Sequence, residues 1–137
     1  MTETSTPAAP SKGNVMLVDD DKFLVDMYSM KFTQAGYNVH ACLSVDSGLD
    51  TLRGGFVPDV ILFDLVMPKN DGFSLLETIR TEKLAPNAIL IALSNQGDEE
   101  AKQKVLSLGA TRLIVKASMI PSEVLQNVEE EMKSHAK

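Results

Sequence analysis

Residues 60–64 read Val-Ile-Leu-Phe-Asp, four consecutive apolar side chains followed at once by a carboxylate. A short run that is apolar at every position and rich in β-branched residues predicts a strand buried on both faces of a sheet. Three similar runs occupy residues 15–18, 88–93 and 113–115, and a weaker, mixed run at residues 37–42 predicts a strand nearer an edge.

Amphipathic helical patterns separate these runs. The first places Leu24, Met27, Tyr28, Phe32 and Ala35 on one face. Similar patterns follow at residues 45–52, 73–79, 101–108 and 121–132. Strand and helix therefore alternate five times, which predicts a parallel sheet covered by helices on both faces, an α/β doubly wound architecture.

Length and composition indicate one globular domain. The chain has 137 residues, of which 44% are hydrophobic and 23% charged. Residues 1–13 are polar and contain two prolines, so we expect a disordered leader there and a folded domain over residues 14–137. No apolar stretch approaches the roughly 20 residues that cross a bilayer, and no apolar signal core is present.

Charge and cysteine content exclude further classes. The net charge of −6 argues against a free-standing nucleic-acid binder, whose affinity would come largely from cations meeting phosphates. Cys42 is the only cysteine, so an internal disulfide and a Cys-x-x-Cys metal site are excluded. We expect a protein of a reduced compartment, the cytoplasm.

Polar side chains follow the predicted strands where each strand ends: Asp19 and Asp20, Asp64, Ser94 and Lys116. Ligands of open α/β sheets bind at this rim. Crowded carboxylates repel unless a cation neutralises them, and oxygen ligands without His or Cys favour Mg²⁺ over zinc. One carboxylate could attack a phosphoryl group, with the serine hydroxyl and the lysine ammonium contacting the phosphoryl oxygens.

Two segments resemble the receiver domain of response regulators in two-component signalling. They are residues 15–21, Val-Met-Leu-Val-Asp-Asp-Asp, and residues 59–72, Asp-Val-Ile-Leu-Phe-Asp-Leu-Val-Met-Pro-Lys-Asn-Asp-Gly. The resemblance covers about residues 14–133, and its most specific part is Asp64-x-x-Met67-Pro68-x-x-Asp71-Gly72. It implies a flavodoxin-like fold like that of single-domain chemotaxis regulators, with five helices and five strands in the order 2-1-3-4-5.

The resemblance also implies residue roles. Asp64 would be the phosphoacceptor, aided by Ser94 and Lys116. Mg²⁺ would be bound by Asp64, by Asp20 directly, by Asp19 mainly through water, and by the backbone carbonyl of Val66. Met67-Pro68 and Gly72 would shape the turn over the site, the glycine by relaxing the backbone.

The implied function is a phospho-switch. A sensor histidine kinase or a histidine phosphotransfer protein would donate the phosphoryl group from a phosphohistidine, and phosphorylation would switch docking to an unknown downstream protein. No nucleic acid, membrane or attached output domain is expected, and the chain would be a monomer or weak dimer. It would not be an enzyme, beyond taking part in its own phosphorylation and slow dephosphorylation.

Two alternatives remain at this stage. The first is a phosphorylation-independent interaction domain, which the joint presence of Asp20, Asp64 and Lys116 disfavours. The second is a phosphohydrolase resembling the haloacid dehalogenases. Those enzymes need a second aspartate two residues after the nucleophile, and Val66 occupies that position.

Three positions depart from the family pattern. Ala117 stands where proline usually follows the lysine, so we expect the peptide after Lys116 to be trans, or cis at a cost of about 2.5–4 kcal/mol. Asn95 follows the switch hydroxyl in place of Ala or Gly. Leu113 replaces the aromatic switch residue, so we expect phosphorylation to move mainly residues 94–98 and the start of the fourth helix.

Overall fold

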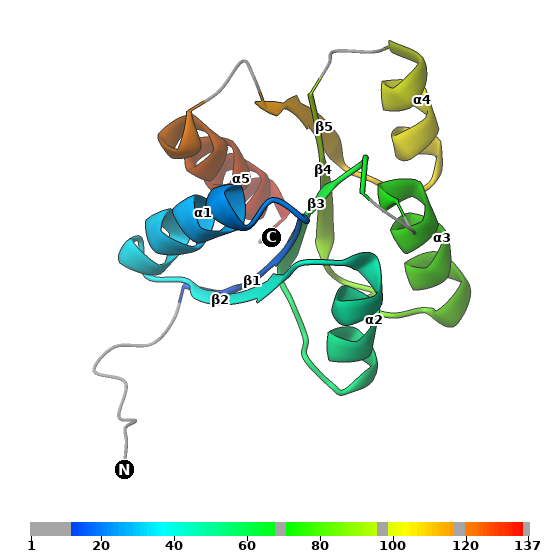
Figure 1. Cartoon of the computed structure of the whole chain (residues 1–137), viewed down its shortest axis with the longest axis horizontal. Coiled ribbons are helices and arrows are strands. Elements are labelled where there is room, and N and C mark those ends of the chain that lie inside the picture. Colours follow the sequence, from blue (N-terminus) through cyan, green and yellow to red (C-terminus); the bar gives the residue numbers. More distant parts are fainter. Residues whose placement is uncertain (1–11, 68–70, 96–98, 117–119, 136–137) are drawn as a thin grey trace.

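The computed structural model describes residues 12–67, 71–95, 99–116 and 120–135. Within these ranges strand and helix alternate five times: β1 (Asn14–Val18), α1 (Lys22–Gln34), β2 (Asn38–Cys42), α2 (Val45–Arg53), β3 (Val60–Asp64), α3 (Gly72–Glu82), β4 (Ile89–Ser94), α4 (Glu99–Ser107), β5 (Arg112–Val115) and α5 (Pro121–His135). All strand pairs are parallel, in the order β2-β1-β3-β4-β5 (Figure 1). The predicted fold class and strand order are confirmed.

The continuous apolar runs supply two separate cores, because successive side chains of a strand point to opposite faces. In β3, Ile61 and Phe63 join a cluster with residues of α2, α3 and α4. Val60 and Leu62 face the other way, into a cluster with α1 and α5. The sheet is thus a middle layer, with two helices on one face and three on the other (Figure 1).

The edges of the sheet differ from the expectation at one end. β2 is an exposed edge strand, as predicted. β5 was expected to be buried on both faces, but it is the other edge strand: only Ile114 is buried, and Leu113 and Val115 are half-buried. An edge strand has a neighbour on one side only, so a short apolar run does not by itself guarantee full burial.

Side-chain caps begin three of the helices. Asp21, Ser44 and Asp71 each accept a hydrogen bond from the backbone N–H three residues on, at the starts of α1, α2 and α3. The buried face of α1 was predicted only in part. Tyr28 and Phe32 are buried as expected, but Val25 is buried in place of Met27, which is half-buried.

Two residues of the predicted leader, Lys12 and Gly13, pair with residues around the start of β2. Lys12 N–H donates to the carbonyl of Gly36, and the carbonyl of Gly13 accepts from Asn38 N–H, both at 2.9 Å. The rest of the predicted leader lies outside the described residues. None of the helices described is both long and apolar enough to cross a bilayer.

Candidate functional site

The register between the two central strands brings the first carboxylates together. Val18 of β1 is paired with Phe63 of β3. The next residues along these strands, Asp19 and Asp64, therefore lie side by side where the strands end. Both aspartates are buried, with 3% and 4% of their surface exposed.

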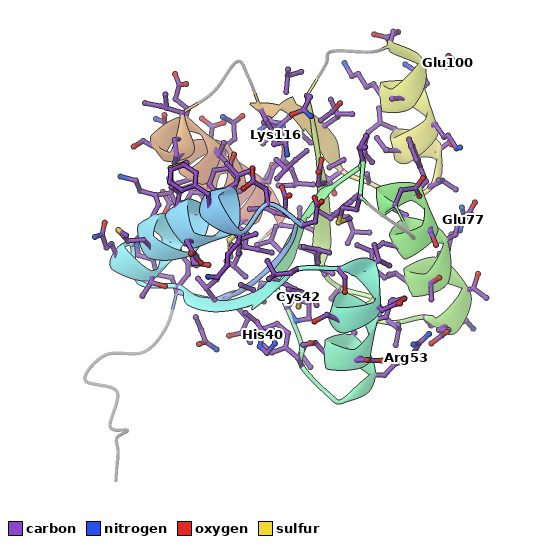
Figure 2. All side chains as sticks on the ribbon, in the orientation of Figure 1. His40, Cys42, Arg53, Glu77, Glu100 and Lys116 are labelled. Carbon is purple, nitrogen blue, oxygen red and sulfur yellow. The ribbon has the colours of Figure 1, made fainter. Side chains whose placement is uncertain are left out.

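The same register places the other two predicted groups at this rim. Asp64 is opposite Leu93 of β4, so Ser94 lies one residue beyond it and is buried. Ser94 is in turn opposite Val115 of β5, and Lys116 follows directly. Figure 2 shows Lys116 at the end of β5.

Three carboxylates meet in one cluster. Asp19, Asp20 and Asp64 each offer an oxygen, and these atoms lie within 4.8 Å of one another. Asp20 is exposed, whereas the other two are buried. The cluster therefore has one open side, toward solvent.

Lys116 is the cation that faces this cluster. Its Nζ donates to Asp19 Oδ2 at 3.2 Å and lies 3.4 Å from Asp64 Oδ1, and its side chain is only 11% exposed. The second contact is an ion pair, and Asp64 Oδ1 accepts no hydrogen bond from the described residues. In the part of the chain that the structure describes, one ammonium thus faces three carboxylates.

The imbalance of charge changes the acidity of Asp64. Burial raises the pKa of this carboxyl, and the neighbouring charge of Asp19 raises the pKa further. Lys116 and a backbone hydrogen bond from Val66 lower the pKa, but they do not restore its ordinary value. Burial, followed by the charges of Asp19 and Asp64, also raises the pKa of Tyr28, which the sequence analysis treated only as a core residue.

The donor set fits a hard divalent cation. Asp64 Oδ1 is a buried acceptor without a hydrogen bond from the described residues, and the three clustered carboxylates offer oxygen ligands without His or Cys. Asp19 Oδ1 already accepts from the N–H of Asp21 at 3.0 Å, which holds that carboxylate in place. These residues fit Mg²⁺. The role of the Val66 carbonyl stays a prediction.

Gly72 contributes to the site for a different reason than predicted. We expected a relaxed backbone, but Gly72 is the first residue of α3 and has no positive φ. A Cβ there would lie 2.6 Å from the carbonyl oxygen of Asp64 and 3.0 Å from Leu65 Cα. Glycine is needed because α3 starts against the backbone at the end of β3.

Several sequence predictions concern neighbouring loops. Asp21, the third aspartate of the segment 15–21, caps α1. Asn95 is exposed. The predicted role of Pro68 and the predicted peptide geometry at Ala117 lie outside the described residues. Tyr28, whose pKa the charges of Asp19 and Asp64 raise, was not predicted to lie near the site, since a tyrosine on a helix face carries no signal of one.

Comparisons with known proteins agree with this geometry. A family model described as the response regulator receiver domain matches residues 15–129. The chemotaxis protein CheY of Treponema pallidum is 34% identical over 109 residues, which cover 74% of this chain and 71% of that protein. The DNA-binding dual master transcriptional regulator RpaA of a Synechocystis species is 28% identical over 102 residues, which cover 74% of this chain and 42% of the regulator. The chain therefore spans less than half the length of that relative.

Solved structures share the fold. The receiver domain of the Francisella response regulator 1452 superposes with a TM-score of 0.79 at 27% identity, covering 90% of this chain and 98% of that one. A CheY-like receiver domain protein from Methanospirillum hungatei gives a TM-score of 0.81 at 24% identity, covering 90% and 95%.

Proposed function

Because the chain belongs to the response regulator receiver domain family, we propose that it accepts a phosphoryl group on Asp64 from a phosphohistidine. A carboxylate oxygen of Asp64 attacks phosphorus, and an O–P bond forms as the P–N bond of the donor breaks. The electron pair of that bond returns to the imidazole. The product is an aspartyl phosphate, and slow hydrolysis returns the carboxylate. In this proposal the chain is no enzyme in the usual sense, since the group that it modifies is its own.

One observation carries the proposal: Asp64 is buried, yet its Oδ1 accepts no hydrogen bond in the part of the chain that the structure describes. A structural aspartate at such a position would be expected to have its acceptors satisfied. The ammonium of Lys116 lies 3.4 Å from that oxygen and would meet the charge of an incoming phosphoryl group. Ser94 follows the neighbouring strand and would donate its hydroxyl to a phosphoryl oxygen.

Mg²⁺, held by Asp19, Asp20, Asp64 and the Val66 carbonyl, would neutralise charge on the phosphoryl oxygens. Without it, three carboxylates at this rim would repel a phosphoryl group. Asp20 is the exposed member of the cluster and borders the open side, so it would bind a cation that arrives from solvent.

The surroundings of the site favour a protein donor, a sensor histidine kinase or a histidine phosphotransfer protein. Three large apolar side chains are exposed shortly after site residues: Phe23 at 74%, Val66 at 73% and Ile120 at 62%. Such side chains near a reactive rim are typical of a surface that a protein partner covers. The action would take place in the cytoplasm, and the downstream partner would be a second protein.

Asp64→Asn tests the acceptor. The amide cannot form the acyl phosphate, so the variant should keep the fold but show no acid-labile, hydroxylamine-sensitive phosphate after incubation with acetyl phosphate and Mg²⁺. Labelling equal to that of the wild type would refute the assignment and favour an interaction domain that works without phosphorylation.

Phe23→Ala tests the protein donor. This variant should slow transfer from a phosphorylated histidine phosphotransfer domain and leave labelling by acetyl phosphate unchanged. Met30, 61% exposed on the same helix, offers the matched control Met30→Ala, which should slow neither reaction. Equal effects of the two variants would show that Phe23 is not part of the docking surface.

A further inference from the structure

Residues of α3, of α4 and of the connection from α3 to β4 line a groove. Both helices lie on the face of the sheet that α2 also covers (Figure 1). The volume of the groove is about 540 Å³, within the range of small-molecule sites. Most of its lining is apolar, and its large apolar side chains are Leu76, Ile79, Leu84, Leu90, Leu106 and Leu108. Leu106 is exposed although it is a large apolar residue, so the groove presents unburied apolar surface to solvent.

The charges on the groove have the opposite sign to the protein. The chain carries a net charge of −6, yet the only charged residues of the lining are the cations Arg80 and Lys83. In the described ranges, neither of them has a carboxylate within ion-pair distance. The carboxylates of Glu77 on α3 and Glu100 on α4 lie on the outer side of these helices (Figure 2).

Arg80 is held across the groove. Its Nη1 donates to the carbonyl of Ser107, at the last residue of α4, over 3.5 Å. This long bond uses one of the five N–H donors of the guanidinium. The remaining donors, together with the ammonium of Lys83, are available to an anion at the edge of the groove.

The C-terminal ends of α3 and α4 do not cancel the attraction of Arg80 and Lys83 for an anion. Both α3 and α4 end at the groove, and a helix C-terminus carries a partial negative charge that weakly disfavours an anion. A hydrogen bond from a full positive charge to a carboxylate is stronger than this partial charge. Since the two cations outweigh the two helix termini, the net preference is for negative charge.

We propose that the groove between α3 and α4 binds a small organic anion, an apolar body that carries one carboxylate. The apolar body would lie against the leucines of the two helices, and the carboxylate would accept from Arg80 and Lys83.

This site is separate from the acidic cluster. α3 begins at Gly72, against the Asp64 backbone, whereas the groove is lined by residues from Leu76 to the far end of that helix. Binding in the groove does not depend on phosphorylation of Asp64. An unmodified protein and Asp64→Asn should therefore bind the anion equally.

Titration of the ¹⁵N-labelled protein with decanoate tests the proposal by amide chemical shifts. We expect saturable shifts at residues 79–90 and 105–109, with a Kd below about 1 mM. Arg80→Gln and Lys83→Gln change exposed side chains and should keep the fold. Each should weaken decanoate binding by about tenfold, the loss expected for one charge-assisted hydrogen bond. Lys102→Gln, an exposed cation on α4 outside the lining, is the matched control and should bind like the wild type.

Decanol separates the two parts of the ligand, because it has the same chain without the charge. It should bind at least several-fold more weakly than decanoate. The proposal is overturned if decanoate causes no saturable shifts in the groove, if decanol binds as tightly, or if Arg80→Gln and Lys83→Gln weaken binding no more than Lys102→Gln does.

Discussion

Gly72→Ala should destabilise the fold, because α3 starts too close to β3 for a side chain. The added Cβ would lie 2.6 Å from the carbonyl oxygen of Asp64, and real contacts of this kind essentially never fall under 3.0 Å. That oxygen belongs to the backbone of a buried central strand, so it cannot rotate away as a flexible side chain would. Either α3 or the end of β3 has to shift, and overpacking of this kind costs about 1–3 kcal/mol.

Gly54→Ala is the matched control. Its Cβ would also face a backbone carbonyl, that of Asp50, but at 3.3 Å, and its φ of −78° suits any residue. Replacing glycine by alanine lowers the entropy of the unfolded chain in both variants, which stabilises each by about 0.4–1 kcal/mol. The difference between the two variants therefore isolates the contact at Asp64.

Urea denaturation followed by circular dichroism gives the free energy of unfolding of each variant. Gly72→Ala should be less stable than Gly54→Ala by about 1–3 kcal/mol, and its labelling by acetyl phosphate should be slower because the Asp64 backbone is displaced. Equal stabilities would show that the helix start accommodates a side chain, and the reasoning on Gly72 would be wrong.

Four further results are expected. Burial and the charge of Asp19 raise the pKa of Asp64 above 3.8. The stability that this carboxyl contributes is therefore fully present below pH 3.8 and is lost as the pH rises through the raised pKa. In urea titrations of the metal-free proteins at several pH values, Asp64→Asn should gain stability over the wild type across this pH range. Asp20→Ala should stop Mg²⁺-dependent labelling and make the metal-free fold more stable, and a variant that is less stable without metal would contradict this. Ala85→Gly should raise the free energy of unfolding by about 1 kcal/mol, because φ is +44° at this alanine; an unchanged value would show no strain there. Hydrogen exchange with a phosphoryl mimic and Mg²⁺ should change more at residues 95–100 than around Leu113, and equal changes would show that Leu113 switches.

The fold and the rim could be predicted from the sequence for the same reason. In a parallel sheet every strand ends at one edge, so residues that directly follow apolar runs must meet there whatever the details of packing. Asp19, Asp64, Ser94 and Lys116 were found in this way, without any knowledge of side-chain positions. The family resemblance added their separate roles.

Burial of individual strands and helix faces was harder to predict. Arg112–Val115 carries the same short apolar signal as the central strands, but only its place in the strand order makes it an edge. Val25 and Met27 lie two residues apart at the start of α1, and the direction in which the helix docks decides which of them is buried. Such outcomes depend on contacts between distant segments, which local periodicity does not contain.

The α3–α4 groove could not be predicted from local sequence patterns. Part of its lining is the connection from α3 to β4, where Lys83 and Ala85 have φ values of +57° and +44°. Positions with positive φ are usually occupied by glycine or asparagine, but here they are occupied by a lysine and an alanine. From the sequence, Arg80 and Lys83 are two solvated cations at a helix end. Only the structure shows that the guanidinium of Arg80 contacts Ser107, 27 residues away in the chain. A site at the rim of a parallel sheet can be predicted from residue types, because strand order brings the ends of the strands together. A groove between two helix ends depends on backbone turns that the residue types do not indicate. Its ligand therefore has to be found by experiment.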